Sequence, residues 1–140
     1  MLHMLRRDLG DTLFRECVRI FYREFEFGNA LSGDFQRVVD SLSAKDHSAF
    51  FRQWLFTPGH PVLSAEWHPS GSGVQFTLKQ QQEGGVFEFP LDIRLELENG
   101  TSIDLTLQIS AREENFTFPT ESRPARVILD PDCWLLFETL

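Results

Sequence analysis

The fold is decided by residues 91–109, which have the sequence LDIRLELENGTSIDLTLQI. Apolar and polar residues alternate strictly in residues 91–98 and again in residues 103–109. Such alternation is typical of strands that bury one face and expose the other. Between the two runs, Asn99-Gly100 is a residue pair that favours two positive φ angles in a tight hairpin turn. The segment therefore predicts an antiparallel hairpin with Asn99 and Gly100 at its turn.

Further short strands are predicted on both sides of this hairpin, between turn signals such as Pro69-Ser70-Gly71-Ser72-Gly73. They are expected at residues 62–67, 74–78, 86–89, 115–118, 126–129 and 134–137. With the hairpin, about seven to eight short strands result, each with one polar face, which is typical of an antiparallel β-sandwich.

The residues before Pro61 have a different period, because their apolar side chains recur at helical spacing. One helix is expected to begin at Asp11, which would cap it after Gly10, and to end at Gly28-Asn29. A second is expected from Ser32, whose hydroxyl would accept a first-turn amide, and a third from Asp46. Residues 1–9 have the composition of the last turns of a helix. The apolar faces expected of the three capped helices are Leu13, Phe14, Cys17, Val18, Phe21 and Phe25; Phe35, Val38, Val39 and Leu42; and Phe50, Phe51, Trp54 and Leu55.

The change of period predicts an α+β chain with two domains. A helical subdomain of about four helices is expected at residues 1–60, and the sandwich at residues 61–140. The connector between the two domains, residues 57–61, is expected to be stiff, because each of its prolines disfavours helical geometry at the preceding residue. Trp54 is expected to anchor the last helix in a core, the alternative being an aromatic that stacks on a ligand. The residues expected to form this structural junction are Trp54, Pro58, Gly59, His60 and Pro61.

The charge balance is acidic, with 13 Lys and Arg against 21 Asp and Glu and a net charge of −8. This balance excludes nucleic acid and anionic membrane surfaces as partners, since both call for clustered basic residues. Residues 1–61 contain eight basic and eight acidic residues, whereas residues 62–140 contain five basic and thirteen acidic. A solvated acidic face on the sandwich is therefore expected, with a docking surface for a basic partner as the alternative.

Targeting signals are not evident in the sequence. The longest apolar runs are far shorter than a membrane span, and the charges at the N-terminus follow the apolar residues rather than precede them. A soluble chain without a signal peptide or transmembrane segment is expected, in an unknown compartment. Cys17 and Cys133 are expected to be buried free thiols, with a long-range disulfide as the alternative.

A search for catalytic and metal-binding patterns yields no candidate. No two of His3, His47, His60 and His68 have the spacing of ligands on one helix, and the group His60, Glu66 and His68 favours a structural or surface role. Neither cysteine has a histidine nearby in sequence, and Gly71-Ser72-Gly73 and Gly84-Gly85 do not precede helices. The acidic pairs Glu113-Glu114 and Asp130/Asp132 are expected in solvated turns. No catalytic and no metal residue is predicted.

Several stretches resemble the aminopeptidase N (membrane alanyl aminopeptidase) family of zinc metallopeptidases. Residues 50–63, FFRQWLFTPGHPVL, are similar to the family's FFDQWLYRPGHPVL segment, and Gly28-Asn29-Ala30 with Ser32 and Asp34-Phe35 is similar to its GNATTEDF stretch. Residues 1–11 resemble the helix, Gly-Asp turn and next helix that follow the family's active site. Residues 86–93 and 130–136 resemble the ends of its immunoglobulin-like domain. The resemblance implies a C-terminal portion: the end of the helical part and an antiparallel immunoglobulin-like β-sandwich.

The resemblance does not extend to the family's chemistry. The Gly-x-Met-Glu-Asn substrate loop, the His-Glu-x-x-His zinc site with its distal Glu and the transition-state tyrosine have no counterpart in this sequence. The one tyrosine, Tyr22, falls in a predicted helix beyond the position of the catalytic one. The resemblance therefore implies no cofactor in this chain, although the parent family uses zinc.

Two functions from different classes are consistent with these observations. The first is a non-catalytic structural and packing module of an aminopeptidase N-like zinc exopeptidase. The alternative is a stand-alone protein-interaction module, related to the family but catalytically dead; a hydrolase with an unrecognised site is a weaker third. The expected partner is the rest of the parent peptidase, or a second copy that associates through the helical part. If the chain is a piece of such an enzyme, we expect Leu2, Leu5, Leu9 or Phe14 to be partly uncovered.

Overall fold

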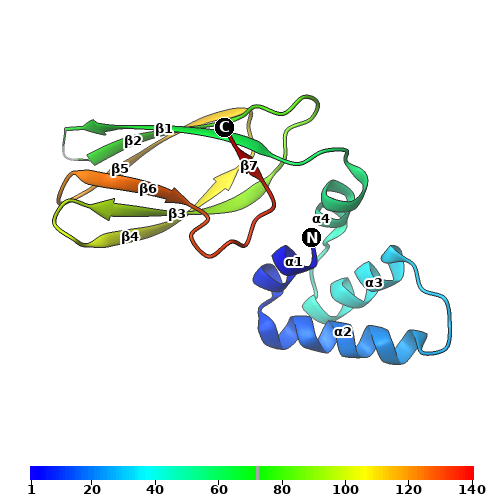
Figure 1. Ribbon diagram of the computed structural model, residues 1–140. Coiled ribbons are helices and arrows are strands. Elements are labelled where there is room, and N and C mark those ends of the chain that lie inside the picture. The colour runs from blue at the N-terminus through cyan, green and yellow to red at the C-terminus, as the bar shows by residue number, and fades with distance from the viewer. Residues whose placement is uncertain (72) are drawn as a thin grey trace. The chain divides into compact units, whose positions relative to one another are not determined.

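The computed structural model describes residues 1–71 and 73–140, so Ser72 of the predicted turn lies outside the described residues. The chain divides into two compact units, Met1–Pro58 and Gly59–Leu140 (Figure 1). The first unit contains α1 (Leu2–Leu9), α2 (Asp11–Phe25), α3 (Ser32–Ser43), α4 (Ser48–Phe51) and the π-helical turn η1 (Arg52–Phe56). The second contains β1 (Val62–Ser70), β2 (Gly73–Gln80), β3 (Phe89–Leu97), β4 (Ser102–Ile109), β5 (Glu113–Pro119), β6 (Pro124–Leu129) and β7 (Glu138–Thr139).

The break between α1 and α2 lies at Gly10, which has a φ of 76°. Asp11 is the first residue of α2 and does not cap it, contrary to the sequence-based expectation. Its carboxylate instead accepts hydrogen bonds from Arg6 Nε at 2.7 Å and Arg6 Nη2 at 2.9 Å. These bonds lower the pKa of Asp11 and raise that of Arg6. An ion pair thus joins α1 to α2 across the glycine.

The expected start of the second helix is confirmed, but its expected cap is wrong. Ser32 is already helical, and Leu31 occupies the N-cap position. The Leu31 amide donates to Asp34 Oδ2 at 3.0 Å. An acidic residue at the third helical position satisfies the N-cap amide in this way, so the Ser32 hydroxyl is not needed there.

The third predicted helix begins two residues later than Asp46 and changes its winding. The Asp46 carboxylate accepts a hydrogen bond from the Ser48 amide at 2.8 Å, and this bond belongs to the turn before α4. After Phe51 the chain continues as η1, where the Thr57 amide donates to the Arg52 carbonyl at 3.2 Å. The wider π winding ends just before Pro58.

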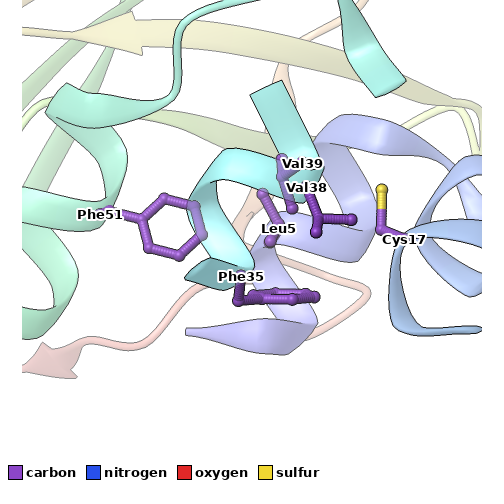
Figure 2. Packing of buried hydrophobic residues seen from close by; sticks show 6 residues of the cluster. All are labelled: Leu5, Cys17, Phe35, Val38, Val39 and Phe51. Carbon is purple, nitrogen blue, oxygen red and sulfur yellow. The ribbon is translucent and has the colours of Figure 1, made fainter. Parts of the chain in front are cut away.

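The core of the helical unit gathers side chains from α1, α2, α3 and α4 (Figure 2). Phe35 lies between Phe21 and Phe51, at ring-centroid distances of 5.1 Å and 6.2 Å. Of the four residues named as candidates for a partly uncovered surface, Leu2 is exposed, Leu9 and Phe14 are partly exposed, and Leu5 is buried. The buried members are Leu5, Cys17, Phe35, Val38, Val39 and Phe51.

The second unit is a β-sandwich of two sheets, with the strand orders β5-β2-β1-β7 and β4-β3-β6. Strands pair antiparallel except that β7 runs parallel to β1. The α+β architecture, a helical part followed by a sandwich, agrees with the prediction. Alternation puts the core side chains of β3 on one face: Phe89, Leu91, Ile93, Leu95 and Leu97.

The predicted hairpin is β3 and β4, paired from Phe89–Ile109 to Glu96–Ser102. Its turn differs from the expectation, because Gly100 has a positive φ (85°) and Asn99 does not. The Gly100 amide donates to the Leu97 carbonyl, and the Leu97 amide donates to the Thr101 carbonyl, both at 2.9 Å. Asn99 Oδ1 accepts the Thr101 amide at 3.1 Å. The result is a three-residue loop with glycine at its left-handed position.

Two predicted strands are corrected by the structure. Residues 86–88 precede β3 without strand geometry, and residues 134–137 form a loop before β7. Just before that loop, Asp130 is buried rather than solvated, and its carboxylate accepts the Trp134 amide at 2.9 Å and the Leu135 amide at 2.7 Å. Both cysteines are free thiols, as expected, but only Cys17 is buried and Cys133 is exposed. Burial raises the pKa of the Cys17 thiol.

Candidate functional site

A buried histidine lies between two carboxylates in the helical unit. His47 Nδ1 lies 3.0 Å from Asp40 Oδ1, and His47 Nε2 lies 3.2 Å from Asp8 Oδ2. The His47 backbone amide also donates to Asp40 Oδ1, at 2.8 Å. The three residues therefore connect α1, α3 and the start of α4. We call the group Asp8, His47 and Asp40 the His47 cluster.

Local structure explains how the His47 cluster forms. Asp40 lies in the last turns of α3, and Ala44, with a φ of 54°, reverses the chain after that helix. The reversal places His47 at the N-cap of α4, back beside Asp40. Asp8 comes from the last turn of α1. With two carboxylates and an imidazole, the cluster can exchange protons.

The predicted junction residues lie in or near the connector, each in a different setting. Trp54 is half-buried in η1, with its ring 6.4 Å from that of Phe50. Pro58 and Gly59 are exposed, and Gly59 has a φ of 86°. His60 Nε2 lies 3.5 Å from Glu138 Oε2, and the carbonyl of buried Pro61 accepts the Glu138 amide at 3.0 Å. His60 and Pro61 therefore help to hold β7.

A polar network around Gln80 and Arg112 in the sandwich was not predicted from the sequence. Gln80, which is 2% exposed, contacts both backbone polar groups of Phe87 through its side chain. The Arg112 guanidinium donates to the carbonyls of Gln80, Gln82 and Gly84. Together Gln80 and Arg112 fix the loop between β2 and β3. The run of three glutamines was the only local signal for it.

The outer face of β3 and β4 has a shallow polar hollow of about 220 Å³. Arg94 Nε and Nη2 donate to the Asp104 carboxylate at 2.6 Å and 2.9 Å, which lowers the pKa of Asp104 and raises that of Arg94. Thr106 Oγ1 donates to Asp92 Oδ1 at 2.6 Å. These groups satisfy one another across the strands, which is the ordinary role of cross-strand polar pairs.

Within residues 1–71 and 73–140, no group of three or more His, Cys, Asp or Glu side chains is placed to hold a metal ion. His60 lies beside Glu138, while Glu66 and His68 are exposed on β1. The described residues therefore do not supply the three or four converging donors that a zinc site needs. Over the same residues, the helices are all too short or too polar to cross a membrane.

A helical unit followed by a β-sandwich is an arrangement found in aminopeptidases of known structure. The crystal structure of Legionella pneumophila aminopeptidase A in complex with aspartic acid matches 99% of this chain and 17% of that chain, with a TM-score of 0.75 and 22% identity. At that identity the match shows the fold alone.

Sequence comparison gives the family. Aminopeptidase N of Lactococcus lactis subsp. lactis is 33% identical over 96 residues, which cover 66% of this chain and 11% of that protein. The alanine/arginine aminopeptidase of Saccharomyces cerevisiae is 30% identical over 130 residues, which cover 86% of this chain and 14% of that protein. No protein-family model matches. The chain is an aminopeptidase N-like segment, and it spans 11% and 14% of the length of these two relatives.

Proposed function

We propose that this chain is a non-catalytic structural part of an aminopeptidase N-like enzyme. The observation that carries the proposal is the disparity in coverage: 86% of this chain aligns with the yeast alanine/arginine aminopeptidase, but only 14% of that enzyme is involved. In this proposal, zinc-dependent removal of N-terminal residues, which the family resemblance implies, would be done by another part of the protein. The helical unit and the sandwich would pack against that part and support it.

Exposed apolar side chains of the helical unit support a packing role. Phe27 is fully exposed at a φ of 64°, which is unusual for an aromatic residue, and Leu31 is exposed four residues later. Apolar side chains that gather on a surface mark contact sites. We infer that the rest of the peptidase covers them in the parent enzyme, and that the chain alone associates with itself through them. The exposed members are Leu2, Val18, Tyr22, Phe27, Leu31, Leu55 and Phe56.

Light scattering as a function of concentration tests the association. The chain is expected to form dimers or larger species, and the double variant Phe27→Asp/Leu31→Asp is expected to remain monomeric. Leu136→Asp, at an exposed leucine of the sandwich, is the matched control and should associate like the unaltered chain. A chain that stays monomeric at high concentration would remove this support.

The coding sequence upstream of Met1 tests the role within a larger enzyme. A reading frame that continues upstream into a His-Glu-x-x-His motif is the expected result. An in-frame stop codon close upstream would contradict the proposal and favour the stand-alone interaction module.

A further inference from the structure

The number of protons on the His47 ring decides how many of its two carboxylate contacts are hydrogen bonds. Both ring nitrogens face carboxylate oxygens, at 3.0 Å in Asp40 and 3.2 Å in Asp8. A carboxylate can only accept, so both contacts are hydrogen bonds only when both ring nitrogens carry a proton. Because the His47 side chain is 5% exposed, water has little access to replace either partner. The geometry is therefore that of an imidazolium ring.

A neutral ring would keep one of these hydrogen bonds and lose the other. The His47 backbone amide donates to Asp40 Oδ1 at 2.8 Å whatever the charge of the ring, so Asp40 stays attached to His47. Asp40 Oδ2 also accepts a hydrogen bond from Gln36 Nε2 at 3.3 Å. Asp8 is 54% exposed, and its carboxylate contacts the ring at Nε2. The bond to Asp8 is thus the one that is lost.

Loss of that bond affects α1 more than the other helices. Asp8 lies in α1, whereas Asp40 and His47 come from α3 and the start of α4. Another polar attachment of α1 is the ion pair between Arg6 and Asp11, and both of those groups keep their charge near neutral pH. The charged groups that face or flank the ring are Asp8 from α1, Asp40 from α3 and Asp46 from the segment before α4.

We propose that the His47 cluster is a pH-sensitive latch, which holds α1 on the helical unit while the His47 ring is protonated and loosens it when the proton leaves. Histidine is the side chain whose charge changes between about pH 5 and pH 8. Both ring contacts can be hydrogen bonds only while the ring carries two protons, so the latch is closed in mildly acidic solution. When α1 loosens, the hydrophobic core of the helical unit loses Leu5, one of its buried members (Figure 2).

Hydrogen exchange of the full chain tests this latch. Protection factors of the α1 amides, which correct for the intrinsic pH dependence of exchange, are measured relative to α3 amides at about pH 5.5 and about pH 8. We expect the α1 protection to fall about three- to tenfold at the higher pH, the size expected for one partly exposed charged hydrogen bond. The nitrogen spectrum of the His47 ring should show two protonated nitrogens at the lower pH and one at the higher.

The variant Asp8→Asn separates a latch from general pH sensitivity. An asparagine amide can donate to an unprotonated Nε2 and accept from a protonated one, so α1 protection should become independent of pH. His68→Gln, at an exposed histidine of the sandwich, is the matched control and should respond to pH like the unaltered chain. The proposal is overturned if α1 protection in the unaltered chain does not change with pH, if Asp8→Asn shows the same fall, or if the ring is neutral at about pH 5.5.

Discussion

The side-chain amide of Gln80 pairs with the backbone of Phe87 as a neighbouring strand residue would. Gln80 Nε2 donates to the Phe87 carbonyl at 2.8 Å, and Gln80 Oε1 accepts the Phe87 amide at 2.9 Å. Gln80 Nε2 also contacts the Ala111 carbonyl at 3.2 Å. Phe87 is buried and lies just before β3. The glutamine side chain bonds to both of its backbone polar groups.

Replacing Gln80 by alanine should therefore be costly. The change removes the two hydrogen bonds between the Gln80 side chain and the backbone of buried Phe87, and we expect the free energy of unfolding to fall by roughly 2–4 kcal/mol. Urea denaturation measures the loss. The neighbouring variant Gln81→Ala removes an exposed side chain whose contact is with Ser64, and it should change stability by less than about 0.5 kcal/mol. Equal effects at the two positions would contradict the role given to Gln80.

Gly73 should not tolerate a larger side chain. A Cβ atom at this position would lie 2.2 Å from the Phe118 carbonyl oxygen, which belongs to the paired strand β5 and cannot move freely. Gly73→Ala is expected to reduce the free energy of unfolding by about 1–3 kcal/mol, because backbone must shift. At Gly85, a Cβ would meet nothing within 4 Å, so Gly85→Ala serves as the control. Thermal unfolding of both variants tests the difference, and an unaffected Gly73→Ala would show that β5 is not held there.

The start of α3 distinguishes the structure from the sequence-based expectation. Asp34→Ala removes the acceptor of the Leu31 amide and should cost about 0.5–2 kcal/mol of stability, while Asp34→Asn should retain much of it. Ser32→Ala should change stability by less than about 0.5 kcal/mol, since Ser32 is not the cap. The opposite order in a denaturation experiment would support the serine as the cap.

The ion pair between Arg94 and Asp104 predicts a dependence on acid. Hydrogen bonding to Arg94 lowers the pKa of Asp104 in the folded chain, so the unfolded chain binds the proton more readily. The stabilisation is present above the ordinary aspartate value of about 3.9 and is lost as the pH falls through the lower folded value. Asp104→Asn should therefore lose less stability between about pH 5 and pH 2 than the unaltered chain does.

Arg94→Gln should show the same reduced sensitivity, because the partner of Asp104 is then missing. Urea denaturation midpoints across the pH range measure the effect, which is small because both side chains are partly exposed. Variants that lose as much stability in acid as the unaltered chain would show that the pair does not contribute.

Periodicity was sufficient to predict the elements that bury a regular face. The apolar stripe on α2 and the alternation in β3 and β4 each repeat over several residues. The residues of each element are therefore enough to predict which of its faces meets the core. The same is true of the change from helices to strands. The backbone at the elements' ends was less predictable: Asn99 lies outside the positive-φ region, and Asp34 rather than Ser32 serves the α3 start.

The candidate sites could not be predicted because their members are distant in sequence. Asp8 and His47 are separated by 39 residues, and Arg112 and Gln80 by 32. Asp130 looks like a solvated turn residue by composition, but two amides a few positions later enclose its carboxylate. No spacing rule connects such residues before the helices and sheets bring them together.

An assay of amino-acid release from aminoacyl-anilide substrates tests the non-catalytic role most directly. The purified chain is incubated with substrate after treatment with a chelator, and again with added zinc. The proposed role predicts no release above the enzyme-free blank in either condition. Release that disappears on chelation and returns with zinc would contradict it.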